Sequence, residues 1–379
     1  MTEYDNRGIP AGQLKKSDWW LIGSAWLVTQ ILLVMYLGIN SRQESLKYIG
    51  LAESWVSGHH RFIWNEVFYS GYVAIHVLLH LVGLPPEAMY IIQLIFSGIA
   101  VIYFVKIICL YVRWRPAIVL SAILFSTCFL IQQWVCALFT DSIFGSLLII
   151  AAYYLLTKHE SSRNKLICRL LLVLLPFFRP VGFLFIVLAC IYWLCDSKKN
   201  HTKELVFFFI YLMLTGVIIY KSLVDNPAYF YPNHNTEANI ICGYPGNLLK
   251  YQKIPYRAGM NMFTYIGENP GMFLRLYVYR FIKVFSMSRD YFSTLHNVLL
   301  AVSCSFYLIL AFIGSFSRTP GFKKILILAL TGIFLFSLPS VLFCVEWSGR
   351  FSLPVYCFIL ILGGFGVNRI RELTHSSSS

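Results

Sequence analysis

The hydrophobic residues of this chain fall into long continuous runs that short polar segments separate. A helix of about 20 apolar residues is long enough to cross a bilayer. The pattern therefore predicts an all-α polytopic membrane protein. The runs cover roughly residues 19–39, 69–84, 88–111, 117–137, 142–157, 166–178, 181–195, 205–224, 294–314, 325–344 and 351–367.

The run 69–84 decides the topology, because counting it as a span gives eleven crossings and omitting it gives ten. With ten crossings and an inner N-terminus, the short inner segments hold sixteen Lys and Arg residues against five in the short outer loops. Positive residues favour the inner side, and an eleventh span would invert every later loop. We therefore predict about ten transmembrane helices and a helix at 69–84 in the outer interface.

Composition agrees with a membrane protein and excludes other classes. Of the 379 residues, 58% are hydrophobic and only 13% are charged. The net charge of +14 is spread over loops between apolar runs, which is typical of membrane topology and not of nucleic-acid binding. The cysteines lie mostly inside apolar runs and form no CxxC pair, so neither a disulfide framework nor a zinc site is predicted. The first apolar run has no small-residue cleavage site, so we predict no cleavable signal peptide.

We divide the chain into three parts. Residues 1–224 form a module of seven spans that contains the first outer loop, 40–87. Residues 225–293 are polar and aromatic and are too polar to span, so they form an outer segment. Residues 294–379 contain three spans and an inner tail. The absence of an internal repeat or of inverted broken helices weakens a transporter interpretation.

The polar residues that need an explanation lie at span ends on the predicted outer side. Glu44 and Tyr48 are four positions apart and would share one face of a helix. Asp141 follows the third span and Arg179 lies at the turn between the fifth and sixth spans. The last turn carries Arg350, four positions after Glu346. We expect these residues to surround a cavity at the outer surface of the bilayer.

These residues also carry a resemblance to a known superfamily. The order ESLKYIGLAESWVSG in the first outer loop resembles the acidic first loop of GT-C glycosyltransferases, in which an interfacial helix follows. FTDS at Asp141, the FRPVG turn at Arg179 and the late EWSGRFSLP segment are similar to that superfamily as well. The sequence departs from it in two places, because the usual first-loop aspartate is Glu44 and the usual tyrosine after the arginine is Phe351.

The resemblance implies a single-displacement, inverting transfer of a sugar from a polyprenyl-phosphate donor. A carboxylate would take the acceptor proton, and arginines would bind the phosphate that leaves. Glu44 is the candidate base and Glu53 stays open as the alternative, while Asp141 would orient donor or acceptor. The further candidates for substrate binding are Tyr48, His59, His60, Arg179, Arg280, Lys283, Glu346 and Arg350.

Each of these residues also has a purely structural interpretation. Glu44 suits the start of a helix, and Asp141 suits the first turn of the fourth span. Arg179 could reach outward to lipid phosphates. Arg350 could pair with Glu346 across one helical turn.

Three functions therefore compete at this stage. The first is a glycosyltransferase of a bacterial inner membrane, with its site on the periplasmic side. The second is a polymerase or ligase that transfers a whole oligosaccharide from a polyprenyl carrier, and the third is a lipid-glycan transporter or flippase without bond chemistry. The expected partners are the lipid bilayer, a polyprenyl-phosphate sugar and a glycan, lipid or protein acceptor, with no nucleic acid. No metal ligands are assigned and no cofactor is certain, although a divalent metal stays open.

Overall fold

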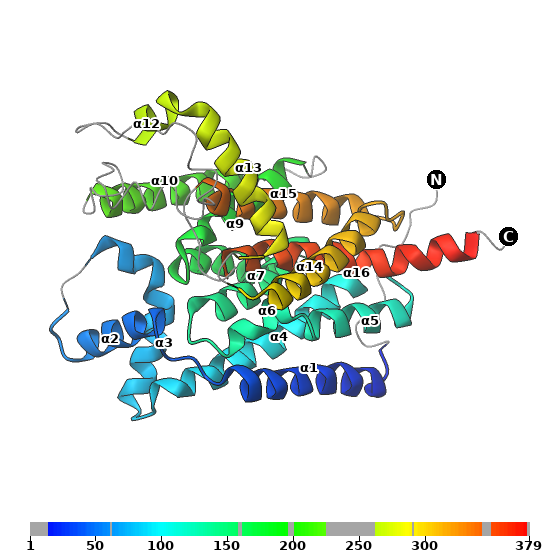
Figure 1. Cartoon of the computed structure of the whole chain (residues 1–379), viewed down its shortest axis with the longest axis horizontal. Coiled ribbons are helices and arrows are strands. Elements are labelled where there is room, and N and C mark those ends of the chain that lie inside the picture. The colour runs from blue at the N-terminus through cyan, green and yellow to red at the C-terminus, as the bar shows by residue number, and fades with distance from the viewer. Residues whose placement is uncertain are drawn as a thin grey trace.

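The computed structural model describes residues 14–60, 63–157, 161–195, 201–224, 262–289, 292–342 and 350–376. Within them the regular structure is helical, apart from one isolated bridge between Asn40 and Ala137. The long helices run side by side as a bundle (Figure 1). They are α1 (Lys16–Leu37), α4 (Met89–Cys109), α5 (Arg115–Ser126), α7 (Thr140–Thr157), α8 (Ser162–Leu174), α9 (Phe183–Cys195), α10 (Thr202–Val224), α14 (Thr294–Ser315), α15 (Phe322–Leu342) and α16 (Leu353–Ser376).

Seven helices among the described residues are long and apolar enough to cross a membrane, and a bent pair brings the number to eight. This confirms an all-α protein with several membrane spans. The predicted count of ten stays a prediction, because α8 and α9 are each only 13 residues long. The helix in the run 69–84 is α3 (Ser70–Leu81), which is not among the candidate spans.

The predicted span 117–137 is not one continuous helix. α5 ends at Ser126, and α6 (Phe129–Gln132) and η4 (Gln133–Val135) continue after a bend of 44°. A Thr127 hydroxyl that donates to the carbonyl of Ile123 at 2.9 Å accompanies the break. The two parts together are long and apolar enough for one span, so the predicted span stays a prediction, with a bend that hydrophobicity alone does not report.

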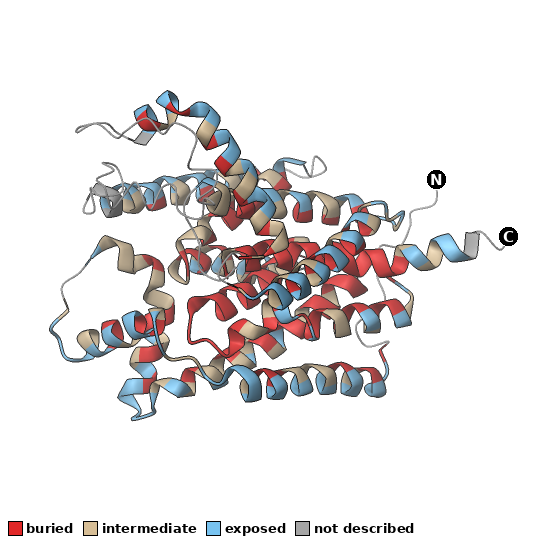
Figure 2. Cartoon of the chain, in the orientation of Figure 1, coloured by how far each residue is buried: buried red, intermediate tan, exposed pale blue. Residues whose placement is uncertain are grey.

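Helix α16 is the centre of the bundle and is buried from Leu353 to Asn368 (Figure 2). It packs against α14, α15, α5 and α7. The α14 contact is especially close, because a Cβ added at Gly314 would lie 2.0 Å from the carbonyl oxygen of Leu362, and one at Gly366 would lie 2.0 Å from that of Leu310. Small residues allow two helix backbones to approach in this way.

The two ends of the bundle differ. The start of α1 and the end of α16 lie at one end, which we call the terminal end, and α2 (Glu44–Val56) and α3 gather at the other, the α2 end (Figure 1). At the terminal end, Arg115 donates to both carboxylate oxygens of Asp18 at 2.6 Å and ties the start of α5 to the start of α1. Glu204 pairs there with Lys165 at 2.8 Å and with Arg169 at 3.1 Å.

The described part of the outer segment 225–293 is also helical. It contains α12 (Met262–Glu268) and α13 (Pro270–Ser286). α13 exposes the apolar residues Leu274, Val278, Phe281 and Ile282 and packs its other side against α15 and α14. An exposed apolar stripe is typical of a helix that contacts lipid.

Candidate functional site

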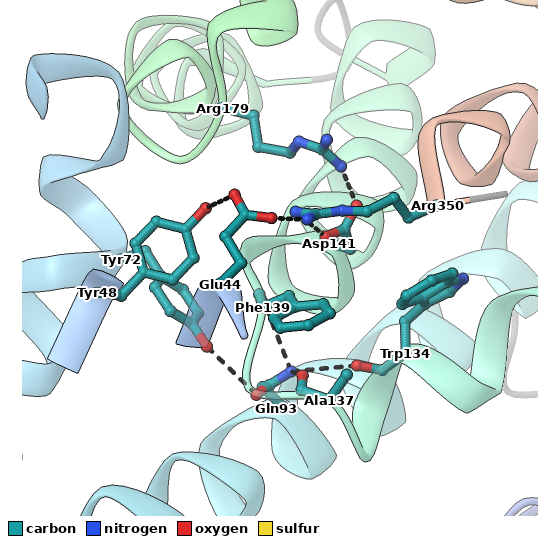
Figure 3. Close-up of polar contacts among 10 residues, drawn as sticks. All are labelled: Glu44, Tyr48, Tyr72, Gln93, Trp134, Ala137, Phe139, Asp141, Arg179 and Arg350. Carbon is teal, nitrogen blue, oxygen red and sulfur yellow. Dashed lines mark hydrogen bonds and ion pairs between the residues drawn. The ribbon is translucent and has the colours of Figure 1, made fainter. Parts of the chain in front are cut away.

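Five of the polar residues selected from the sequence meet at the α2 end (Figure 3). Glu44 opens α2 and Tyr48 follows one turn later. Asp141 lies in the first turn of α7. Arg179 directly precedes the short helix η6 (Pro180–Gly182), and Arg350 opens η8 (Arg350–Ser352) immediately before α16. Four segments that are distant in sequence thus contribute to one site.

The acids and arginines alternate in an unbroken series that we call the charge chain: Glu44, Arg350, Asp141 and Arg179. Arg350 pairs through Nη1 with Glu44 Oε2 and through Nη2 with Asp141 Oδ2, the latter at 2.6 Å. Arg179 donates from Nη1 to Asp141 Oδ1. The Arg350–Asp141 contact is an ion pair without good hydrogen-bond alignment, since Asp141 Oδ2 accepts no hydrogen bond of proper geometry.

The charge chain is buried, with Glu44 as its most accessible member. The side chains of Asp141, Arg179 and Arg350 are at most 4% exposed, whereas that of Glu44 is 25% exposed. Two acids and two bases cancel in formal charge, and this pairing makes the burial tolerable. Isolated buried charges would be far more costly.

Aromatic rings pack against both guanidinium groups. The centre of the Phe351 ring lies 4.7 Å from the Arg179 guanidinium and 5.4 Å from that of Arg350. Phe139 lies 4.8 Å from Arg350 on another side. A cation near the face of an aromatic ring is attracted by the ring quadrupole, and the planar guanidinium is held in position. Phe351 makes this ring contact without a hydroxyl.

Tyr48 holds the carboxylate of Glu44 from the side opposite Arg350. Its hydroxyl donates to Glu44 Oε1 at 2.7 Å, which confirms that the two residues share a helix face. Burial, together with the nearby Tyr69 and Asp141, raises the pKa of the Tyr48 hydroxyl, so Tyr48 remains a donor at any physiological pH. The Tyr72 ring of α3 packs edge-on against Tyr48 with ring centres 5.1 Å apart.

The segment after the bent span forms the floor of the site, and Gln93 and Asn40 hold it in place. The buried side chain of Gln93 on α4 donates to the carbonyl of Ala137 at 2.8 Å, and more weakly to those of Trp134 and Phe139 at 3.3 and 3.4 Å. Asn40 pairs with the same segment through its backbone, donating to Cys136 and accepting from Leu138. Figure 3 shows Gln93 beneath the charge chain.

A pocket of about 230 Å³ lies beside the exposed end of the charge chain. Its walls come from the end of α1, the start of α2, the segment 133–139 and Arg350. Gln43, which lines it directly before Glu44, has a backbone φ of 58° and ψ of −120°. Non-glycine residues rarely adopt such angles, and strain of this kind is concentrated at functional sites.

Other residues selected from the sequence do not join the charge chain. Glu53 is exposed and lies nine positions along α2, about 13 Å from Glu44 at the rise of an α-helix. His59 is exposed, and His60 pairs with Glu66 at 3.0 Å. Both histidines therefore lie beyond the far end of α2.

The candidates of the outer segment lie on α13. Arg280 is buried and donates to the carbonyl of Leu342 at 3.4 Å, and Lys283 reaches the Ser288 hydroxyl at 3.4 Å. Among the described residues, neither contacts the charge chain. Glu346 lies outside the described residues, so its predicted pairing with Arg350 stays a prediction.

Metal binding has no obvious location in the described part of the chain. No group of three or more His, Cys, Asp or Glu residues there is arranged to hold an ion. The carboxylates that approach one another, Glu44 and Asp141, each contact an arginine instead. A metal bound jointly with a substrate phosphate stays an open expectation.

Sequence reasoning missed Gln93 and the pocket residues Gln43, Gln133 and Trp134. One signal for them was present, since the polar run Gln132–Gln133–Trp134 interrupts a predicted span. Gln93 offers a similar signal as an amide inside an apolar run. Buried amides within membrane helices are uncommon and mark contacts that need hydrogen bonds.

Comparison with known proteins adds no assignment. No protein-family model, no curated protein and no solved structure matches this chain.

Proposed function

We propose that this protein is a glycosyltransferase that transfers a sugar from a polyprenyl-phosphate donor to an acceptor hydroxyl. The convergence of two carboxylates and two arginines from four distant segments, buried at one end of a membrane bundle beside a pocket, supports this proposal. Ionisable residues are costly at membrane depth and are retained there for function. The resemblance of these same segments to GT-C enzymes supplies the reaction type.

The arginines bind the donor phosphate in this proposal. Arg350 lines the pocket and Arg179 lies one carboxylate further along the charge chain. A guanidinium presents several N–H donors to phosphate oxygens and keeps its charge when buried. Both groups are already fixed by Asp141 and by Phe351, so they stabilise the charge that develops on the leaving phosphate without moving far. Asp141, fully buried between them, acts as their positioning residue.

Glu44 is the general base, and its partner Arg350 controls when it acts. An ion pair with Arg350 lowers the basicity of a carboxylate. Donor phosphate oxygens that bind Arg350 replace Glu44 as its partner, and the carboxylate is then free to accept a proton. The acceptor oxygen forms a bond to the anomeric carbon as the bond from that carbon to the phosphate oxygen breaks. Polyprenyl phosphate leaves with the bonding electron pair, and the acceptor proton passes to Glu44.

We place the reaction on the outer face of a membrane, the periplasmic side of a bacterial inner membrane. The support is the distribution of basic residues. Arg115, Lys165 and Arg169 lie at the terminal end, opposite the charge chain. Lys and Arg in short loops favour the inner side of a membrane.

Substitution of Glu44 tests the proposal most directly. We expect Glu44→Gln to reduce transfer by about 10²–10⁴-fold, the contribution of a general base, while the protein still inserts and folds. The assay incubates purified protein with a set of polyprenyl-phosphate sugars and candidate acceptors and measures product mass. One added sugar indicates a transferase, and a whole added oligosaccharide indicates a polymerase or ligase.

Glu53→Gln is the matched control, because Glu53 lies on the same helix but is exposed and apart from the charge chain. It should retain full turnover. Normal turnover in Glu44→Gln together with loss in Glu53→Gln would transfer the role of base to Glu53. No product from the wild-type protein with any donor would remove the enzyme assignment.

A further inference from the structure

Three neutral amide residues are among those that line the pocket beside Glu44. Asn40 and Gln43 come from the link between α1 and α2, and Gln133 comes from η4. Among the described residues, none of their NH₂ groups donates a hydrogen bond, and Asn40 uses only its oxygen, which accepts from Arg42. Amides offer both donors and acceptors to a ligand. The pocket therefore presents unused hydrogen-bonding capacity.

Two buried donors in the same wall also lack partners. Arg350 Nε and Trp134 Nε1 are both shielded from solvent and make no hydrogen bond to any described residue. The two residues are 3% and 6% exposed. Buried donors are almost always satisfied in folded proteins, so the wall of the site holds polar atoms that the described residues leave unsatisfied. Neither atom is exposed to the pocket, so the hydrogen bonds to a ligand come from the amides instead.

The size and charge of the pocket restrict that ligand. Its volume of about 230 Å³ is below the roughly 300–1,000 Å³ of pockets that enclose drug-sized molecules, which suits a single ring and not an oligosaccharide or peptide. Among the described residues, Glu44 and Arg350 are the only charged ones that line it. An acidic ligand would meet the Glu44 carboxylate, which is the more exposed of the two. A neutral ligand avoids this repulsion.

We propose that this pocket binds the acceptor as one neutral, hydroxyl-rich ring, a sugar with no carboxylate or phosphate. This inference rests on the proposed function and narrows its acceptor from a glycan, lipid or protein to a glycan hydroxyl. The amides bind ring hydroxyls and the indole of Trp134 supplies an apolar wall for the ring. One hydroxyl points at Glu44, which takes its proton in the transfer step given above.

Binding of neutral glycosides to the full-length protein tests the proposal without any donor. The probes are methyl glycosides of neutral hexoses, with methyl glucuronide and methyl galacturonide as charged counterparts. Saturation-transfer NMR and calorimetry on protein in nanodiscs report the affinity. We expect the neutral glycosides to bind, and the charged probes to bind at least tenfold more weakly. Preferred binding of a charged probe would overturn the proposal.

Variants locate the binding. We expect Gln133→Ala and Trp134→Phe each to weaken neutral glycoside binding several-fold and Trp134→Ala at least tenfold. Trp20→Ala, which removes an exposed tryptophan of α1, is the matched control and should leave binding unchanged. Size-exclusion profiles confirm folding, and Gln133→Ala keeps the test valid if Trp134→Ala fails to fold. Unchanged affinity in both Gln133→Ala and Trp134→Phe would place the sugar elsewhere and overturn the proposal.

A second comparison separates a soluble from a membrane-anchored acceptor. The same hexose is offered as a methyl glycoside in solution and as a glycolipid within the nanodisc. Loss of binding of either form in Trp134→Ala supports the pocket, and the tighter form identifies the source. If Trp134→Ala leaves both forms bound as in the wild type, the pocket is not the sugar site.

The glycoside-binding measurements can be interpreted whether or not the proposed reaction takes place. Glu44→Gln should still bind the neutral glycoside and should gain affinity for methyl glucuronide, because the repelling charge is gone. If the wild type binds the glycoside but transfers no sugar, the proposed reaction is contradicted and the carbohydrate site still stands. If Gln133→Ala and Trp134→Phe transfer sugar as well as the wild type, the proposed pocket is contradicted and the reaction still stands.

Discussion

Ion pairs lie at both ends of the bundle, and their surroundings differ sharply. At the terminal end, Arg115 grips Asp18 with two well-aligned hydrogen bonds, and its own side chain is 40% exposed. At the α2 end, the side chains of Arg350 and Asp141 are at most 4% exposed, and both residues retain a polar atom without a hydrogen bond. At the terminal end, both carboxylate oxygens of Asp18 accept hydrogen bonds and Arg115 is accessible to solvent. The charge chain is buried, and some of its polar atoms have no hydrogen bond.

This difference distinguishes a structural ion pair at the terminal end from a candidate functional site at the α2 end. An accessible ion pair contributes little to stability and joins two helix starts at small expense. A buried chain of four charges gives no clear gain in stability, because desolvation offsets the attraction between its members. We therefore take its position beside a pocket as support for the proposed function. The following variants test this contrast, beginning with the largest expected effect.

Removing one charge from each end should give the clearest contrast. Asp141→Asn leaves Arg350 and Arg179 as buried cations that face each other, and we expect a loss of about 3–5 kcal/mol of unfolding free energy. Asp18→Asn at the terminal end should lose about 1 kcal/mol, because Arg115 remains hydrated. Thermal unfolding in detergent measures both. Equal losses would show that burial does not distinguish the two ends.

The α2 end should also carry an acid sensitivity of its own. Burial lowers the pKa of His76 on α3 to about 4, and its Nε2 has no hydrogen-bond partner among the described residues. The unfolded chain, with a histidine pKa near 6.5, binds a proton between pH 6.5 and 4 that the folded state does not. Stability therefore falls as pH drops through this window, by up to about 3 kcal/mol.

His76→Gln should flatten that part of the stability curve, as measured by unfolding at several pH values between 4 and 7. His80→Gln on the same helix is the control, because His80 is exposed. A curve of His76→Gln that is parallel to the wild type would assign the acid sensitivity to other groups.

The planar shape of the arginine side chain should affect donor affinity at the α2 end and not at the terminal end. Arg350→Lys keeps the charge but loses the fork that reaches Glu44 and Asp141 together, so we expect donor affinity to fall by about 10–100-fold. Arg115→Lys at the terminal end should leave donor affinity unchanged. Titration of each variant with a polyprenyl phosphate gives the comparison. An unaltered affinity in Arg350→Lys would take Arg350 out of the donor site.

The smallest effect should come from Tyr48. Tyr48→Phe removes the hydrogen bond to Glu44 Oε1 and retains the ring between Tyr69 and Tyr72. One such bond is worth about 1 kcal/mol, so transfer should fall several-fold with the fold intact. A kinetic comparison with wild type measures this change. A fall as large as that of Glu44→Gln would instead give Tyr48 a direct part in the chemistry.

The sequence alone was enough to select the residues of the charge chain as candidates, because each lies near the end of an apolar run. Loop charge then placed Glu44, Asp141, Arg179 and Arg350 on one side, and the structure brings all four into contact. The sequence did not show which acid pairs with which arginine. The structural alternative paired Arg350 with Glu346, which lies outside the described residues, and the described partners of Arg350 are Glu44 and Asp141.

The floor of the site was not predictable from hydrophobicity. Residues 117–137 form one apolar run, and only backbone geometry at Thr127 and Cys128 creates the bend. The bend leads into the segment 133–139 beneath the charge chain, where Gln93 binds three of its carbonyls. Such contacts depend on the relative position of two helices, and the hydrophobic periodicity of the sequence does not predict that position.

The burial of α16 determines which half of the site can open. Arg350 lies at the head of a helix that four neighbours enclose and that two glycines lock against α14. Glu44 belongs to α2, whose packing is mainly with the short helix α3. If a substrate separates Glu44 from Arg350, we expect α2 to move and Arg350 to stay in place, because α16 is held by more neighbours than α2. We then expect the packing of α2 against α3 to determine how easily the site opens.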